Sequence, residues 1–292
     1  MESGDRDQMM HRALTPALLL APATLLFLLF FVAPFITLGI NSFYDYGRMS
    51  GIIEVFTLKN YQRLWLDDYY LAIIGRTFRL SGTVAVMTLL VGYPVALYLL
   101  AASARAKSLV IALILSPLLI SVIVRTFGWA VILGKNGLLE SAFEVIGIPG
   151  ITFLHTEAAV VVGLVNVLTP FVVLAVATSL QSMDPALPLA AASLGASPLR
   201  VLWAVILPLS LPGITAGLLI VFGLASASFV TPAVLGGAQF KVLSVIMYQQ
   251  AIVLQNWPFA AAIAVTLLVI VLIVQGVQIG VSERAARQAM PL

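Results

Sequence analysis

The chain has 292 residues, of which 61% are hydrophobic and only 9% are charged. Its mean hydropathy is +1.10, whereas a soluble chain of this length carries about 25% charged residues. This composition excludes an ordinary soluble domain and indicates a polytopic membrane protein. The net charge of +3 comes from scattered residues, not a basic stripe, so nothing points to nucleic acid. The absence of cysteine excludes disulfides and thiolate chemistry.

Long uncharged runs predict an all-α integral membrane fold with six spanning helices, since each run approaches the roughly 20 residues that cross a bilayer. The predicted spans are 15–40, 77–102, 108–133, 158–181, 211–232 and 259–281. The first run is too long for the apolar part of a signal peptide, so we expect it to be retained. Basic residues are denser in the loops on the side of the two termini, which favours cytoplasmic termini.

Two connecting segments are expected to lie outside the spans. Residues 41–75 predict an external amphipathic segment at the membrane interface, where Trp65, Tyr69 and Tyr70 would sit well. Residues 231–257 are predicted as irregular chain or a partly inserted hairpin. They either wall a cavity, because irregular backbone at membrane depth needs protein or water around it, or form an ordinary external loop.

The search for catalytic chemistry gives almost nothing. His11 and His155 have no second histidine at metal-binding spacing. No glycine-rich loop ends in Gly-Lys-Ser/Thr, so this chain is not expected to hydrolyse ATP. We therefore predict no catalytic residue, no metal site and no bound cofactor, and a membrane enzyme is the weakest of the functional classes.

A few polar residues within the spans are candidates for a translocation path. Arg125 is the charge that lies deepest, and it either faces a partner or an aqueous path, or snorkels and bonds to backbone carbonyls; we favour the second interpretation. The other path candidates are Trp129, Asn166, Ser226 and Ser228. Helix packing is the default interpretation of the two serines, because small residues let helices approach closely.

Residues 184–212 predict two short helices joined by a turn. Asp184 is a good N-cap, Gly195 suits a helix end that needs a positive φ, and Ser197 begins a second helix. Pro208 and Pro212 are expected to interrupt that helix before the fifth span. The apolar residues of the second helix, namely Leu199, Leu202, Trp203 and Ile206, repeat at helical spacing, and such an exposed patch is typical of a docking site.

This stretch resembles the EAA loop of ABC importer permeases. The resemblance is carried by Ala190-Ala191, Gly195, Leu207-Pro208 and Pro212-Gly213-Ile214 at the intervals of that loop. The family often has glutamate where this chain has Leu189. Residues that the resemblance assigns to ATPase coupling are Ala190, Ala191, Gly195, Ala196, Leu199, Leu207, Pro208, Pro212 and Gly213. It also implies one transmembrane domain over 1–292, with core spans at 77–281 and a cytoplasmic coupling helix-turn-helix at 182–212, between spans four and five.

Residues 124–140 and 225–250 are similar to permeases of spermidine/putrescine-type importers. This resemblance implies a second homologous permease, two cytoplasmic ATPase subunits that carry ATP and Mg, and an external solute-binding protein at a bacterial cytoplasmic membrane. The implied function is ATP-driven import of a small polar solute, such as a polyamine, by alternating access.

The residues themselves leave the solute open. A polyamine should meet carboxylates or aromatic faces, and the spans offer aromatic candidates in Tyr93, Phe127 and Trp129 but no carboxylate except Glu157 at a helix edge. Arg125, if it faces the path, would oppose a cation. An opine, amino-acid-like or phosphonate solute therefore remains an alternative. A stand-alone channel or secondary transporter also remains open, although it leaves the apolar loop unexplained.

Overall fold

The computed structural model describes residues 20–145, 147 and 152–289, with residues 282–289 described by their backbone only. Within that part of the chain, six helical stretches are long and apolar enough to cross a membrane: Leu20–Asn41, Asp68–Ala101, Val122–Val145, Glu157–Gln181, Pro198–Ala227 and Trp257–Val281. The predicted all-α membrane fold is confirmed. Residues 15–19 of the first predicted span and His11 lie outside the described residues.

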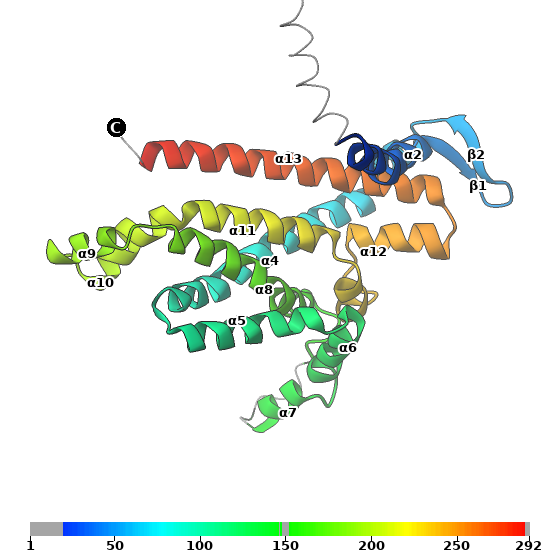
Figure 1. The fold of residues 1–292 in the computed structure, drawn as a ribbon. Coiled ribbons are helices and arrows are strands. Elements are labelled where there is room, and N and C mark those ends of the chain that lie inside the picture. Colours follow the sequence, from blue (N-terminus) through cyan, green and yellow to red (C-terminus); the bar gives the residue numbers. More distant parts are fainter. Residues whose placement is uncertain (1–19, 146, 148–151, 290–292) are drawn as a thin grey trace, which may run out of the picture.

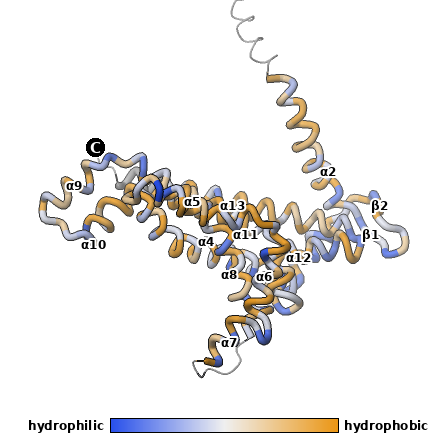
Figure 2. Tube along the Cα trace, turned by 60° about the horizontal axis from the view of Figure 1, so that its bottom comes forward, coloured by the Kyte–Doolittle hydropathy of each residue, from blue (hydrophilic) through white to orange (hydrophobic). Residues whose placement is uncertain are grey.

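The first helical stretch ends with π-helix η1 (Leu28–Val32) and α2 (Ala33–Asn41); α2 lies against the last helix of the chain, and the part before it projects from the bundle (Figure 2). None of the most apolar window of this stretch is buried, and Figure 2 shows the projecting part as a hydrophobic segment. Phe31 stacks on Phe27 at 4.9 Å between ring centroids and packs on Phe35 at 5.1 Å. Lipid or another membrane chain is the environment that suits such a surface.

The predicted amphipathic segment 41–75 is confirmed only over the helix α3 (Lys59–Leu66), and residues 68–75 belong to the next helix. The segment contains an antiparallel hairpin, β1 (Tyr44–Gly47) with β2 (Gly51–Phe56), followed by α3. The Asn60 amide ties α3 to the hairpin by donating to the carbonyls of Ser42 and Tyr44, at 3.0 and 2.9 Å. Trp65 and Tyr69 are exposed as expected, but Tyr70 is buried and packs edge-on against Phe259, so it does not lie at an interface.

Three helices form the core of the bundle: α4 (Asp68–Ala101), α8 (Glu157–Gln181) and α11 (Leu207–Ala227). They share an apolar interior made mainly of valine, leucine and alanine residues. α4 begins well before the predicted residue 77, because the Asp67 carboxylate caps it by accepting from the Tyr69 N–H at 2.9 Å. α11 ends at Ala227 and not at the predicted residue 232. The predicted span 158–181 matches α8 closely.

The third predicted span, 108–133, is broken. Two helices replace it, α5 (Ala104–Leu119) and α6 (Val122–Leu133), separated by extended backbone at Ile120, with φ −90° and ψ 137°. Arg125 donates from its guanidinium to the carbonyl of Pro117, one of the carbonyls that the end of α5 leaves without a helical partner. The helix α7 (Leu138–Val145) follows α6.

Residues 231–250 form a largely buried segment that is helical except for irregular chain at 237–242, so they are not an ordinary external loop, whereas residues 251–257 are mostly exposed. The helices here are η3 (Pro232–Gly236), α12 (Leu243–Tyr248) and η4 (Gln249–Val253). Leu235 and Leu243 are fully buried. Gly237 turns the chain with φ +57° directly against the His155 ring, where a Cβ would collide. The last helix, α13 (Trp257–Ala289), covers this segment and α11.

The loop between α8 and α11 is the predicted helix-turn-helix, α9 (Ala186–Ser193) and α10 (Pro198–Val201), which we call the knob (residues 184–206). It lies at the opposite end of the molecule from the β1–β2 hairpin (Figure 1). Pro208 and Pro212 do not end the helix as predicted. α10 continues through π-helix η2 (Leu202–Ile206) into α11, which contains both prolines. The wider π turn relieves the crowding that a proline ring causes in an ordinary helix.

Candidate functional site

The turn of the knob is built as the sequence predicts. Gly195 has φ +85°, and the N–H groups of Gly195 and Ala196 donate to the carbonyls of Ala192 and Ala191, at 3.0 and 3.1 Å. This pair of bonds is a Schellman cap, which satisfies the last carbonyls of α9. On the far side of the turn, the Ser197 hydroxyl accepts from the Arg200 N–H at 3.4 Å and starts α10. Backbone hydrogen bonds therefore fix the angle between the two helices.

The surface of the knob is apolar and uncovered. The exposed fractions are 68% for Leu189, 89% for Leu194, 66% for Leu199 and 64% for Trp203. Leu202 and Ile206, predicted to join this patch, are only half-exposed. Four large apolar side chains turned outward on so short a segment form a surface that gains from a protein partner.

The residues assigned to ATPase coupling occupy two places. Ala190, Gly195 and Leu199 are exposed on the knob, and Ala191 and Ala196 are half-exposed beside them. The rest, Leu207, Pro208, Pro212 and Gly213, belong to α11. Gly213 is buried against α8, where an added Cβ would lie 2.5 Å from Cβ of Ser179 and 2.6 Å from the Ala175 carbonyl oxygen. This position therefore lets α11, which follows the knob, pack closely on α8.

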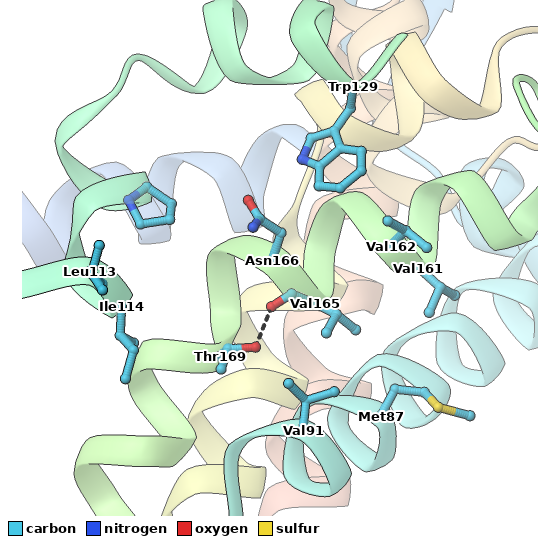
Figure 3. Close-up of a pocket in the computed structure, with 11 residues that line it drawn as sticks. Met87, Val91, Leu113, Ile114, Trp129, Val161, Val162, Val165, Asn166 and Thr169 are labelled. Atoms are coloured by element: carbon cyan, nitrogen blue, oxygen red, sulfur yellow. Dashed lines mark hydrogen bonds between the residues drawn. The ribbon is translucent and has the colours of Figure 1, made fainter. Parts of the chain in front are cut away.

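A hollow of about 500 Å³ lies beside α8, between α4, α5 and α6 (Figure 3). Most of its lining is apolar, and Trp129 and Asn166 are the two predicted path residues that share it. The residues around the hollow are Met87, Val91, Leu113, Ile114, Pro117, Trp129, Val161, Val162, Val165, Asn166 and Thr169. A concave, largely apolar site with a few polar groups is typical of a small-molecule pocket.

The other predicted path residues are not part of the lining, although Arg125 bonds a residue that is. Arg125 is half-buried and donates to the Pro117 carbonyl, as the favoured interpretation expected. Ser226 is buried and donates to the Ser81 hydroxyl at 2.9 Å, a contact that joins α11 to α4. Ser228 ends α11, and its carbonyl accepts from the Ser244 hydroxyl at 2.6 Å. The hydrogen bonds of these three residues join parts of the helical bundle to one another.

The aromatic candidates divide in the same way. The Tyr93 hydroxyl lies 3.1 Å from the Ser210 hydroxyl on α11, and Phe127 is exposed away from the lining. Trp129 alone among the three lines the hollow.

One feature that the sequence does not reveal is an ion pair between Arg79 on α4 and Glu157 on α8. Nε of Arg79 donates to Oε1 of Glu157 at 3.2 Å, and a second nitrogen of the guanidinium bonds the other carboxylate oxygen. The two residues are 78 positions apart in the chain. In the sequence, the only signal is that each residue begins a series of residues spaced four apart along its own helix, which places the series on one helix face.

No metal site exists in the described part of the chain, since no group of three or more histidine, cysteine or acidic residues could hold an ion there.

The bundle of apolar helices, with an exposed apolar knob at one end and a hollow at its side, is a multi-pass membrane fold with a surface suited to a protein partner. The chain belongs to the family of inner membrane components of binding-protein-dependent transport systems, whose model matches residues 13–286. It is therefore an importer permease, a multi-pass protein of the bacterial inner membrane.

Two characterised relatives are similar over most of the chain. The spermidine/putrescine transport system permease protein PotB of Escherichia coli K12 is 32% identical over 249 residues, which cover 85% of this chain and 89% of that protein. PotB of Haemophilus influenzae is 32% identical over 216 residues, which cover 73% and 75%.

A solved structure shares the fold. It is a bacterial alginate ABC transporter in complex with an alginate pentasaccharide-bound periplasmic protein. Its matching chain has a TM-score of 0.76 and 18% identity, with 96% of this chain and 97% of that chain covered.

Proposed function

We propose that this chain is a permease subunit of an ATP-driven polyamine importer that works by alternating access. A second, homologous permease completes the pathway, an external binding protein delivers the solute, and two ATPase subunits bind the knob from the cytoplasm. ATP and Mg belong to those ATPase subunits, and this chain holds no cofactor. Residues 1–292 act as one transmembrane domain with cytoplasmic termini.

The observation that carries the polyamine assignment is the 32% identity to PotB over 85% of the chain. The site is compatible with it. Trp129 offers an aromatic face, which attracts ammonium groups, and Asn166 offers a carbonyl acceptor in the same hollow. Arg125 is not itself part of the lining, but it donates to the carbonyl of Pro117, which is, so its charge lies beside the hollow and counts against a cation there.

The knob supports the coupling to an ATPase. A permease without a partner would leave Leu194 and Trp203 in water, where exposure of such side chains is unfavourable. A stand-alone channel or secondary transporter needs no such surface. The capped turn at Gly195 fixes α9 against α10, and α10 is continuous with α11 through η2. A displacement of the knob by the ATPase would therefore move α11.

The experiment is uptake by the assembled transporter. The chain is reconstituted in proteoliposomes with its partner permease, ATPase and binding protein, and radiolabelled spermidine is added with the binding protein. We expect ATP-dependent uptake that unlabelled putrescine inhibits and that an opine, an amino acid or a phosphonate does not. Uptake of one of those solutes, with none of spermidine, would replace the polyamine assignment and leave the importer class intact.

A further inference from the structure

The Arg79–Glu157 ion pair lies in line with the hollow, at the end remote from the knob. On α8, Glu157 is followed at intervals of four by Val161, Val165 and Thr169, and these three line the hollow. On α4, Arg79 is followed at the same interval by Thr83, Met87 and Val91, of which the last two also line it. Residues four apart share one face of a helix. The two stripes therefore run from the ion pair into the hollow.

The distances along the helix axes place the ion pair at the entrance of the hollow. At about 1.5 Å per residue, Glu157 lies about 6 Å along α8 from Val161, and Arg79 lies about 12 Å along α4 from Met87. α4 and α8 both begin at this end and pack closely, since Gly92 of α4 fits against Val172 and Val173 of α8 further down. The carboxylate is thus one helical turn from the lining of the hollow.

The two partners of the pair are unequally fixed. The Glu157 side chain is 30% exposed and belongs to the first turn of α8, where a helix favours a negative charge. The Arg79 side chain is 65% exposed. The pair is bidentate, but water screens the exposed guanidinium, so another cation can compete with it for the carboxylate.

A second hollow beside Arg79 could receive the displaced guanidinium. Arg79 borders this hollow of about 330 Å³ with Ala72, Gly75 and Arg76, where the two small residues leave open space beside α4. Arg76 itself is placed over the Phe240 ring at 5.6 Å. Arg79 is therefore the partner with open space beside it, while Glu157 lies in the first turn of α8.

We propose that Glu157 selects cationic solutes at the mouth of the hollow, and that an ammonium group of the entering polyamine replaces the Arg79 guanidinium on its carboxylate. This inference rests on the proposed function, since it assigns a specificity-determining residue to polyamine import. While the solute is absent, Arg79 neutralises the carboxylate. When the solute arrives, exchange of one cation for another leaves the net charge at the carboxylate unchanged.

The test uses the complete reconstituted transporter, with spermidine imported per ATP hydrolysed as the readout. Glu157→Gln is expected to lower this ratio about tenfold, because one charge-assisted hydrogen bond to the solute is lost. Arg79→Gln removes only the competing cation, so the ratio should stay at the wild-type level or rise. Glu157→Asp, which keeps the charge, should restore much of the loss. Asp45→Asn breaks the other described ion pair, Lys59–Asp45, away from the hollow, and should change nothing.

A structural role for the pair gives a different pattern. If Glu157→Gln and Arg79→Gln lower the ratio equally, or Glu157→Gln leaves it unchanged, the selection role is overturned while spermidine uptake by the wild type still supports the proposed function. If Arg79→Gln is the more damaging variant, Arg79 contacts the solute and the inference is also overturned. If the wild type hydrolyses ATP but imports no spermidine, the polyamine assignment fails first and the inference fails with it. Co-purified ATPase, measured for each variant, shows that the complex has assembled.

Discussion

Gly195→Asp separates the fold of the knob from its docking role. Gly195 has φ +85°, and a Cβ built there meets nothing within 4 Å. The cost of the substitution to the fold is therefore backbone strain alone, about 1–2 kcal/mol for a left-handed residue with a side chain. Asparagine and aspartate are the side chains that tolerate this conformation best. The spans should insert normally, because none of their contacts is changed.

The cost to docking is much larger. The new carboxylate would lie on the apolar surface that includes Leu194 and Leu199, and a partner that covers this surface must strip water from the charge. An unpaired buried charge costs several kcal/mol. Since each 1.4 kcal/mol is tenfold in affinity, we expect Gly195→Asp to weaken ATPase binding at least about 100-fold.

The assay compares Gly195→Asp with Gly195→Asn, which has nearly the same shape and the same backbone strain but no charge. The amount of ATPase subunit that co-purifies and the ATP-dependent uptake in proteoliposomes are measured for both. We expect the asparagine variant to retain most of both activities and the aspartate variant to lose them. The reasoning is refuted if both variants remain at wild-type levels, or if both reach the membrane and lose ATPase binding equally.

Three further predictions concern packing, the hollow and the hairpin. Gly213→Ala should destabilise the protein by about 1–3 kcal/mol through the clash with α8, and a thermal melt in detergent should show this against Gly82→Ala, which has open space; equal melting temperatures would disprove it. Trp129→Ala should lower spermidine uptake about fivefold through loss of a cation–π contact, with ATPase binding unchanged, and unaltered uptake would remove this residue from the path. A hydrogen bond from Lys59, and after it one from the adjacent backbone N–H, hold the pKa of Asp45 below its ordinary value of 3.8. The stability that this pair gives the hairpin is therefore complete above 3.8 and lost as the pH falls through the lower folded value. Hydrogen exchange of the hairpin should show this acid-induced opening, and Asp45→Asn should abolish the step; a step that persists in that variant would assign it to another group.

Local chemistry made the knob predictable. The cap at Ser197 and the positive φ of Gly195 depend on residues within five positions of each other, so the sequence contains the whole explanation. Five of the six spans were predictable for a similar reason, since apolar length alone indicates them. The continuation through Pro208 was not predictable, because a π turn rather than a helix end absorbs the proline ring.

Features that depend on distant contacts escaped prediction. Hydropathy indicated one helix over 108–133, and the break at Ile120 becomes intelligible only with Arg125 bonded to the Pro117 carbonyl. The Arg79–Glu157 pair joins two helices far apart in the chain. Ser226 was interpretable as path or packing until its bond to Ser81 placed it between α4 and α11.

The central claim is that the knob receives the ATPase, and a cross-link tests it most directly. The chain has no cysteine, so Ser193→Cys places a single thiol on the exposed face of α9. A second variant, Ser50→Cys, places one on the exposed turn of the β1–β2 hairpin at the opposite end. With a thiol-to-amine cross-linker in native membranes, we predict that position 193 joins this chain to the ATPase subunit and that position 50 does not. A cysteine at position 193 that never links to the ATPase, but is labelled from outside the cell, would contradict the claim.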